Sequence, residues 1–188
     1  MDVIRKDFKY KVIKNFLTDK EWNLMYGYCR LRHTNNRDKF AAPDEIPTAD
    51  TSFYGDPLME SLMILKKQEM EKLTGKELFP TYSFWRMYTH GAILPKHSDR
   101  PSCEISVTVN IFGDEDWPIF MDGKPLILKP GDACIYLGQE VEHLRDEYEG
   151  DHQAQVFLHY VDKNGKNAEW NLDKREHIAI SERIKNAI

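Results

Sequence analysis

The stretch "LPKHSDRPSCEISVTVNIF", residues 94–112, joins a strand pattern to two side chains that bind metals. His97 and Asp99 are separated by one residue, and residues i and i+2 of a strand point the same way. An imidazole and a carboxylate can therefore face one point, although H-x-D also suits an ordinary polar turn. After it the residues alternate, with Ile105, Val107, Val109 and Ile111 on one side and Ser106, Thr108 and Asn110 on the other.

The composition is that of an ordinary globular protein. The chain has 188 residues, 41% hydrophobic and 30% charged, which is enough for one well-buried core. A net charge of −5 without a basic surplus argues against a general nucleic-acid binder. The N-terminus has no long apolar run, so we expect neither a signal peptide nor a membrane span. Cys29, Cys103 and Cys134 form no CxxC pair, which predicts reduced thiols in a cytoplasmic protein.

Two helices are predicted in the first part of the chain. Thr18 and Glu21 form a capping box ahead of "EWNLMYGYCRLR". "PLMESLMILKKQEMEKLTG" is the second helix, because Pro57 suits its first turn and Gly75 its end. The polar segment 33–56 between them is long for a connection, and such loops are often lids or binding loops.

From residue 78 onward the hydrophobic period changes to that of strands. "TYSFWRMYT" places Tyr82, Phe84, Arg86 and Tyr88 on one face. Asp122-Gly123 marks a hairpin, and a second hairpin is expected in "HLRDEYEGDHQAQVFLHYVD", turning near residues 149–151. Two helices followed by many short strands predict a mostly β fold with flanking helices, whose core is an antiparallel double-sheet jelly roll.

The whole chain, 1–188, is interpreted as a single domain. We expect a helical N-terminal support over 1–77, the jelly-roll core over 78–162 and a C-terminal tail helix over 163–188.

His143 is the best candidate for a third metal ligand. It follows the strand "GDACIYLG" and precedes a polar-rich strand. Two histidines and one carboxylate on one face define the facial triad of non-haem Fe(II) oxygenases, which leaves coordination positions open. His33, His90 and His177 are interpreted as ordinary polar residues, whereas His152 and His159, on the last strand, stay open as candidates.

Residues 82–162 resemble the catalytic core of the Fe(II)/2-oxoglutarate-dependent dioxygenases, most of all the prolyl and lysyl hydroxylase branch. Tyr88, Gly91, His97 and Asp99 have the spacing of the Y-x-x-G…H-x-D segment of that branch. "LKPGDACIY" is similar to its Pro-Gly-containing strand before the distal histidine, and "VFLHYVD" to its closing strand. The fold that this resemblance implies is the double-stranded β-helix.

The resemblance also implies a reaction. Fe(II) would bind His97, Asp99 and His143, and 2-oxoglutarate would chelate the iron. Dioxygen would drive the decarboxylation of 2-oxoglutarate to succinate, coupled to hydroxylation of an aliphatic C–H. Halogenases of this superfamily lack the carboxylate ligand, so Asp99 implies a hydroxylase. The implied substrate is of prolyl or lysyl type, as a small molecule or within a peptide.

One part of the family pattern is missing. The family usually places Lys or Arg beyond the distal histidine to pair with the far carboxylate of 2-oxoglutarate, and here Gln153 stands near that position. A buried carboxylate without a partner is costly. We therefore assign it to Arg145, which points the same way as His143 on a regular strand. Tyr88 and Gln155 are expected to add hydrogen bonds.

Several alternatives remain open at this point. Arg145 could instead form a solvated salt bridge with Asp146 or Glu147. Arg86, on the face of Tyr88, is a second cationic candidate, and both Arg86 and Arg100 are expected to contact substrate. The protein could also be a non-catalytic jelly-roll module that binds a sugar or peptide, or a cupin-like metal enzyme that does not use 2-oxoglutarate. The oligomeric state cannot be read from the sequence.

Overall fold

The fold is taken from a computed structural model of the chain, which describes residues 8–35 and 49–179. The helices are α1 (Asp19–Asn35) and α2 (Pro57–Thr74), with 3-10 turns at Pro101–Cys103 and Ala168–Lys174. The strands are β1 (Tyr10–Ile13), β2 (Ala49–Tyr54), β3 (Leu78–Thr89), β4 (Leu94–His97), β5 (Ile105–Gly113), β6 (Ile119–Met121), β7 (Lys124–Leu126), β8 (Ala133–Leu137), β9 (His143–Arg145) and β10 (His152–Asp162).

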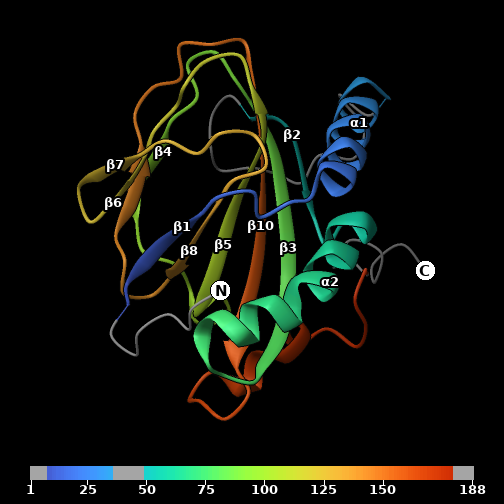
Figure 1. The fold of residues 1–188 in the computed structure, drawn as a ribbon, viewed down its shortest axis with the longest axis vertical. Helices are drawn as coiled ribbons and strands as arrows, with labels where there is room; N and C mark the ends of the chain where they lie inside the picture. Colours follow the sequence, from blue (N-terminus) through green and yellow to red (C-terminus); the bar gives the residue numbers. More distant parts are fainter. Residues whose placement is uncertain (1–7, 36–48, 180–188) are drawn as a thin grey trace.

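The strands form two antiparallel sheets. A six-stranded sheet has the order β1-β8-β5-β10-β3-β2, and a four-stranded sheet has the order β4-β9-β6-β7. The small sheet lies on one side of the large one, and both helices lie on its other side (Figure 1). This arrangement confirms the predicted fold class, a mostly β jelly roll with flanking helices.

The helices cover the outer face of the large sheet with one continuous apolar core. The alternation predicted for β5 is confirmed, because its apolar set belongs to this core and is fully buried. Trp85 of β3 contributes the same face, and Met59, Met63 and Met70 contribute from α2. Burying one such side chain is worth about 1.5–3 kcal/mol. The core therefore stabilises the large sheet from its outer face and leaves the inner face available for a functional site.

The predicted helix ends are confirmed by specific hydrogen bonds. The carboxylate of Glu21 accepts from the backbone N–H of Thr18, and the Thr18 hydroxyl lies 3.3 Å from the Glu21 nitrogen, which completes the capping box. At the second helix the Asp56 carboxylate accepts from the N–H groups of the first turn, and Gly75 ends the helix with a φ of 67°. Glycine adopts this left-handed conformation without steric cost.

The turns between strands also follow their local sequence. Asp122 and Gly123 join β6 to β7 with φ values of 47° and 76°, so the predicted hairpin is confirmed. In the "KPGD" segment, Asp132 donates its N–H to the carbonyl of Lys129, and Gly131 has a φ of 84°. Those values are typical of a type II turn with proline then glycine at its centre.

The second predicted hairpin is wrong. A turn does lie near residue 150, but the strands on its two sides do not pair with each other. β9 pairs with β4 and β6 in the small sheet, whereas β10 pairs with β3 and β5 in the large sheet. The chain crosses between sheets here, because sequence pattern marks a turn and does not specify the partner of the strand that follows.

The predictions for residues 33–56 and 163–188 also need correction. Residues 33–35 continue α1, and Ala49–Tyr54 form β2 at the edge of the large sheet, so neither stretch is loop. Residues 36–48 lie outside the described residues. Within 163–179 there is no α-helix but a kinked 3-10 segment, in which Leu172, Asp173 and Lys174 have positive φ. The rest of the predicted tail helix, 180–188, lies outside the described residues.

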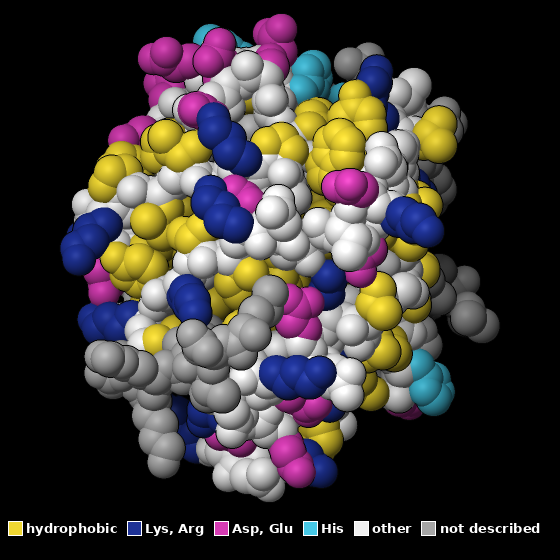
Figure 2. Space-filling model, viewed as in Figure 1, with side chains coloured by type: hydrophobic (Ala, Val, Ile, Leu, Met, Phe, Trp, Pro, Cys, Tyr) yellow, Lys and Arg dark blue, Asp and Glu magenta, His cyan; other side chains and the backbone are white. Residues whose placement is uncertain are grey.

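The distribution of surface charge and the state of the cysteines match what the composition predicts. On the face shown in Figure 2, Lys and Arg side chains are interspersed with Asp and Glu rather than gathered in one basic patch. The three cysteines are buried and unpaired. Among the described residues, neither helix has the length and apolar character that a membrane crossing requires.

Candidate metal centre

The inner face of the large sheet, opposite the helices, borders a cavity of about 680 Å³. Inward-pointing side chains of β3 line it in the predicted alternating set, Tyr82, Phe84, Arg86 and Tyr88. The same cavity is lined by His97, Asp99 and His143. The structure therefore places the three predicted metal ligands at one concave surface.

The two histidines come from neighbouring strands of the small sheet. His97 ends β4 and His143 begins β9, and they lie opposite each other in the antiparallel register. Asp99 follows β4 in the chain, and its Oδ1 lies 3.7 Å from Nε2 of His97 and 3.6 Å from Nε2 of His143. The three ligand atoms all lie within 4.8 Å of one another. Three ligand atoms at these distances can hold one metal ion.

Both imidazoles are fixed in the form that binds a metal. Nδ1 of His97 lies 2.7 Å from the carbonyl oxygen of Pro95, and Nδ1 of His143 lies 3.0 Å from that of Val141. A carbonyl only accepts, so each Nδ1 carries a proton, and in the neutral ring Nε2 is then the nitrogen with the lone pair. Burial lowers the pKa of His143, although the nearby Asp99 carboxylate opposes this effect. Its imidazole therefore stays neutral, as a ligand must.

Asp99 is held by the large sheet. Its N–H donates to the carbonyl oxygen of Gly138 at 2.8 Å, just after β8. The hydroxyl of Ser106, on β5, donates to Asp99 Oδ2 at 2.9 Å, which leaves Oδ1 to face the histidines. A β-carbon at residue 138 would lie 2.5 Å from that Oδ2, so glycine is the residue that leaves room for the carboxylate.

The donor set fits the metal that the sequence predicts. Two imidazoles and one carboxylate on one side of a cavity suit Fe(II), and they leave its remaining positions toward the cavity. The hydrogen bonds behind each ligand, to Pro95, Val141 and Ser106, are of the kind that orient metal ligands in proteins.

Arg145 lies between the two sheets as a buried cation without a carboxylate partner. It is 3% exposed, and its guanidinium contacts the ring and the carbonyl oxygen of Trp117. No ion pair joins it to Asp146, Glu147 or any other described residue, and its Nη2 has no hydrogen-bond partner. Burial lowers its pKa to about 10. The alternative of a solvated salt bridge is therefore wrong.

Two further buried donors, on β3 and β10 of the large sheet, are also unsatisfied. The hydroxyl of Tyr88 and the amide nitrogen of Gln155 have no hydrogen-bond partner. Tyr88 packs on Trp117 with ring centroids 5.0 Å apart, and Trp117 is the residue that Arg145 contacts. Buried polar groups are normally paired, so the unused donors of Arg145 and Tyr88, which both contact Trp117, indicate a place for an anionic or oxygen-rich ligand.

The remaining candidates lie where their strands place them. Gln153 uses its amide nitrogen on Asn110, at 3.3 Å, so it turns toward β5. Arg86 lines the cavity and stacks on Phe84, with its guanidinium 4.8 Å from the ring centre. Arg100 lines the cavity too, and its Nη2 donates to Asp173 at 2.7 Å.

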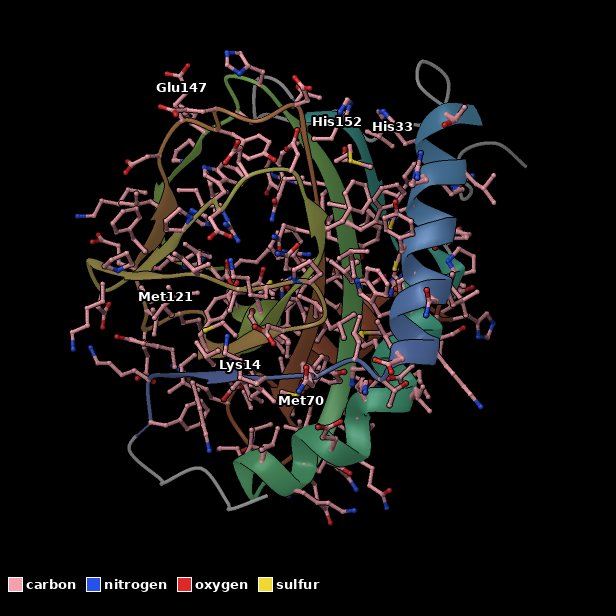
Figure 3. The ribbon with its side chains drawn as sticks, turned by 45° about the horizontal axis from the view of Figure 1, so that its top comes forward. Lys14, His33, Met70, Met121, Glu147 and His152 are labelled. Atoms are coloured by element: carbon pink, nitrogen blue, oxygen red, sulfur yellow. The ribbon has the colours of Figure 1, made fainter. Side chains whose placement is uncertain are left out.

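The other histidines lie in three kinds of environment. His33 and His152 pack on each other, with ring centroids 5.3 Å apart, where α1 passes the end of the large sheet (Figure 3). His90 and His177 are exposed. His159 is different, because it lines the cavity and lies near Asp99 and Cys103. Burial lowers the pKa of His159 to about 4, so its ring is neutral.

Sequence reasoning missed the residues that hold Asp99. The alternation of residues 105–111 predicts that Ser106 lies on the polar side of its strand. This is the signal that could have identified Ser106 as a site residue. Gly138 gave a weaker signal, since a glycine after a strand is common. Its contact with Asp99 joins residues distant in the chain, and local pattern does not report such contacts.

No family model matches the sequence, and no curated protein matches it. Many solved structures share the fold. A Pseudomonas putida prolyl-4-hydroxylase matches with a TM-score of 0.66 and 15% identity, over 83% of this chain and 94% of that one. The viral collagen prolyl hydroxylase of Paramecium Bursaria Chlorella virus-1, in complex with 2-oxoglutarate, matches with a TM-score of 0.62 and 11% identity, over 82% and 96%.

These similarities establish the fold. The chain has the double-stranded β-helix fold of the Fe(II)/2-oxoglutarate-dependent oxygenases, as the sequence resemblance implied. SnoN, a non-haem α-ketoglutarate-dependent epimerase from nogalamycin biosynthesis, has the same fold, with a TM-score of 0.66, 12% identity and 82% and 78% of the two chains covered. Proteins that catalyse different reactions therefore share this architecture, and the reaction must be argued from the site.

Proposed function

We propose that the protein is a non-haem Fe(II)- and 2-oxoglutarate-dependent dioxygenase that hydroxylates an aliphatic C–H bond. The substrate is a small molecule or a peptide side chain, of prolyl or lysyl type. The observation that carries this proposal is the convergence of the His97 and His143 Nε2 atoms and the Asp99 carboxylate beside a cavity. This is the ligand set that holds Fe(II) with positions to spare.

His97, Asp99 and His143 would hold the iron. Iron bound there, with 2-oxoglutarate and dioxygen, supplies the oxidising power that breaks an unactivated C–H bond. Ser106 keeps one carboxylate oxygen of Asp99 turned toward the ion. The carbonyl groups behind both imidazoles hold a proton on Nδ1, so Nε2 is the nitrogen that would bind the ion.

Arg145 would bind the far carboxylate of 2-oxoglutarate. The supporting observation is that Arg145 is a buried cation with an unused N–H group, which only an anion satisfies well. Tyr88 and Gln155 offer two more unused donors to the same ligand. This trio replaces the Lys or Arg that the resembling family carries beyond its distal histidine.

The rest of the cavity would receive the substrate. Phe84, Phe157 and Tyr136 line it and exclude water from the metal side. Arg86 and Arg100 border the same space and would contact the substrate. An aromatic wall of this kind suits the aliphatic part of a substrate better than it suits a charged part.

The test is an anaerobic titration of the apoprotein with Fe(II) and then 2-oxoglutarate. We expect the weak visible charge-transfer band of the iron chelate, and succinate release once oxygen and substrate are added. His97→Ala and His143→Ala should both abolish the band, while exposed His90→Ala should keep it.

Two results would overturn the proposal in different ways. Iron binding without the band would favour a metal enzyme that does not use 2-oxoglutarate. Failure to bind iron would favour a non-catalytic ligand-binding module.

A further inference from the structure

Ser106 makes close polar contacts with Asp99, Cys103 and His159, also pairs with the Tyr136 hydroxyl, and has only one hydrogen to donate. Its Oγ lies 2.9 Å from Asp99 Oδ2, 3.1 Å from the carbonyl oxygen of Cys103 and 2.9 Å from Nδ1 of His159. The carboxylate and the carbonyl can only accept. The Ser106 hydrogen therefore goes to an oxygen, and His159 supplies the third contact by donating from Nδ1.

This assignment fixes the other nitrogen of His159. In a neutral imidazole with the proton on Nδ1, Nε2 is an acceptor. His159 lines the cavity, yet no described residue hydrogen-bonds its Nε2. The ring is only 5% exposed. The structure therefore leaves this nitrogen as an acceptor at the cavity surface, where a ligand can donate a hydrogen bond to it.

Two hydroxyl groups near His159 already have partners. The Tyr54 hydroxyl donates to Asp173 Oδ2, which also receives Arg100. The Tyr82 hydroxyl contacts Cys103 Sγ at 3.1 Å. Asp173 is 9% exposed, and its second oxygen, Oδ1, is buried without a hydrogen-bond partner. Asp173 Oδ1 is therefore an unused acceptor that lies behind the cavity-lining Tyr54 and Arg100.

Unused donors and unused acceptors are therefore both present around the metal centre. Tyr88, Arg145 and Gln155 leave donors unused, which suits a dicarboxylate. Nε2 of His159 and Oδ1 of Asp173 are unused acceptors, while the charge of Arg100 is offset by Asp173. A ligand that pairs with Nε2 of His159 must bring its own O–H or N–H group.

We propose that His159 is a substrate-positioning residue, and that the substrate carries a hydroxyl, amide or amine group that donates a hydrogen bond to Nε2. This inference rests on the proposed function and narrows its substrate class. The hydrogen bonds continue from His159 through Ser106 to Asp99. A substrate held at Nε2 is thereby placed at a fixed position relative to the metal ligands.

Two substitutions at residue 159 separate the roles of the two ring nitrogens. His159→Asn keeps a polar group near the Nδ1 position, which contacts Ser106, and removes the one at Nε2. His159→Gln reaches the Nε2 position with its carboxamide oxygen. The matched probes are benzyl alcohol and benzyl methyl ether, which differ in the presence of a donor. Their dissociation constants are measured by ligand-observed NMR on protein loaded with Zn(II) and 2-oxoglutarate.

The alcohol should bind wild-type protein and His159→Gln about three- to tenfold more tightly than the ether, the effect of one neutral hydrogen bond. His159→Asn should lose that preference. The proposal is wrong if the ether binds wild-type protein as tightly as the alcohol, or if folded His159→Asn keeps the preference. The wild-type comparison decides alone should His159→Asn fail to fold.

The Fe(II)/2-oxoglutarate band is recorded on the same three proteins. Loss of the band in wild-type protein is a failure of the proposed function. A normal band with no preference between the probes is a failure of this inference alone.

Discussion

Gly138 lies against Asp99 so closely that a β-carbon at residue 138 would be 2.2 Å from the Cys103 carbonyl oxygen and 2.5 Å from Asp99 Oδ2. Gly138→Ala must therefore move the loop that carries the carboxylate ligand. We expect at least a tenfold loss of Fe(II) affinity and a destabilisation of about 1–3 kcal/mol, measured by metal titration and urea unfolding.

Gly27→Ala is the control for this substitution. A β-carbon at Gly27, on α1, meets nothing within 4 Å, so iron affinity should not change. Wild-type iron affinity in Gly138→Ala would show that the carboxylate does not depend on this contact.

Ser106→Ala removes the hydroxyl that orients Asp99 and receives His159 Nδ1. Loss of a hydrogen bond behind a metal ligand typically costs about 10–100-fold in metal affinity, and we expect that range for Fe(II) in an equilibrium titration. Ser61→Ala provides the comparison, since Ser61 is exposed on α2 and bonds only a carbonyl of its own helix. Equal iron affinities of the two variants would contradict the role assigned to Ser106.

Arg145→Met should have opposite effects on stability and on ligand binding. It removes a buried charge that has no ion-pair partner, so the thermal midpoint of the ligand-free protein should rise by a few degrees. The same change removes the partner of the far carboxylate, and the 2-oxoglutarate dissociation constant should rise by about 10-fold or more. Calorimetry measures both. Exposed Arg30→Met should leave both unchanged, and normal 2-oxoglutarate affinity in Arg145→Met would refute the assignment.

Asp132, in the turn before β8, makes stability depend on pH. Burial alone would raise its pKa, but hydrogen bonds from Lys14 and from the N–H groups of Asn15 and Lys129 outweigh it, so the pKa is lowered. A lowered folded-state pKa contributes stability above the unfolded value of about 3.9. That contribution is lost as pH falls through the folded pKa.

Asp132→Asn should therefore destabilise the protein by roughly 1–3 kcal/mol at pH 7 and flatten the pH dependence below pH 4. Urea unfolding at several pH values measures this. Asp116→Asn is the matched surface change, because Asp116 is 54% exposed and its pair with Lys129 is worth under about 1 kcal/mol. Equal effects of the two changes would rule out the role of the buried turn.

Much of the fold follows from local pattern. Alternation in β3 and β5, the Asp122-Gly123 turn and the helix caps at Glu21 and Gly75 all depend on residues close in the chain. Each therefore leaves a signal in the sequence. The metal triad also leaves a signal in the sequence, because His97 and Asp99 are two residues apart and the order of the strands indicates His143.

The features that local pattern did not predict depend on distant contacts. β2 lies in a polar stretch and becomes a strand because β3 offers it an edge. The segment after residue 163 is shaped by long-range bonds such as Arg175 to Glu60 and Asp173 to Tyr54, not by helical periodicity. The partner of β10 was mistaken for the same reason, since a turn near residue 150 is compatible with either sheet.

The three ligands are anchored in different layers. His97 and His143 belong to the small sheet, while Asp99 is tied to the large sheet through Ser106 and Gly138. An ion bound by all three is consequently a cross-link between the layers, with no disulfide needed. Metal at one hundred times its dissociation constant adds about 2.7 kcal/mol of stability. Removing the metal should therefore weaken the contact between the two sheets at the ligands first. Amide hydrogen exchange should become faster in β4 and β9, while the helix-covered face of the large sheet stays protected.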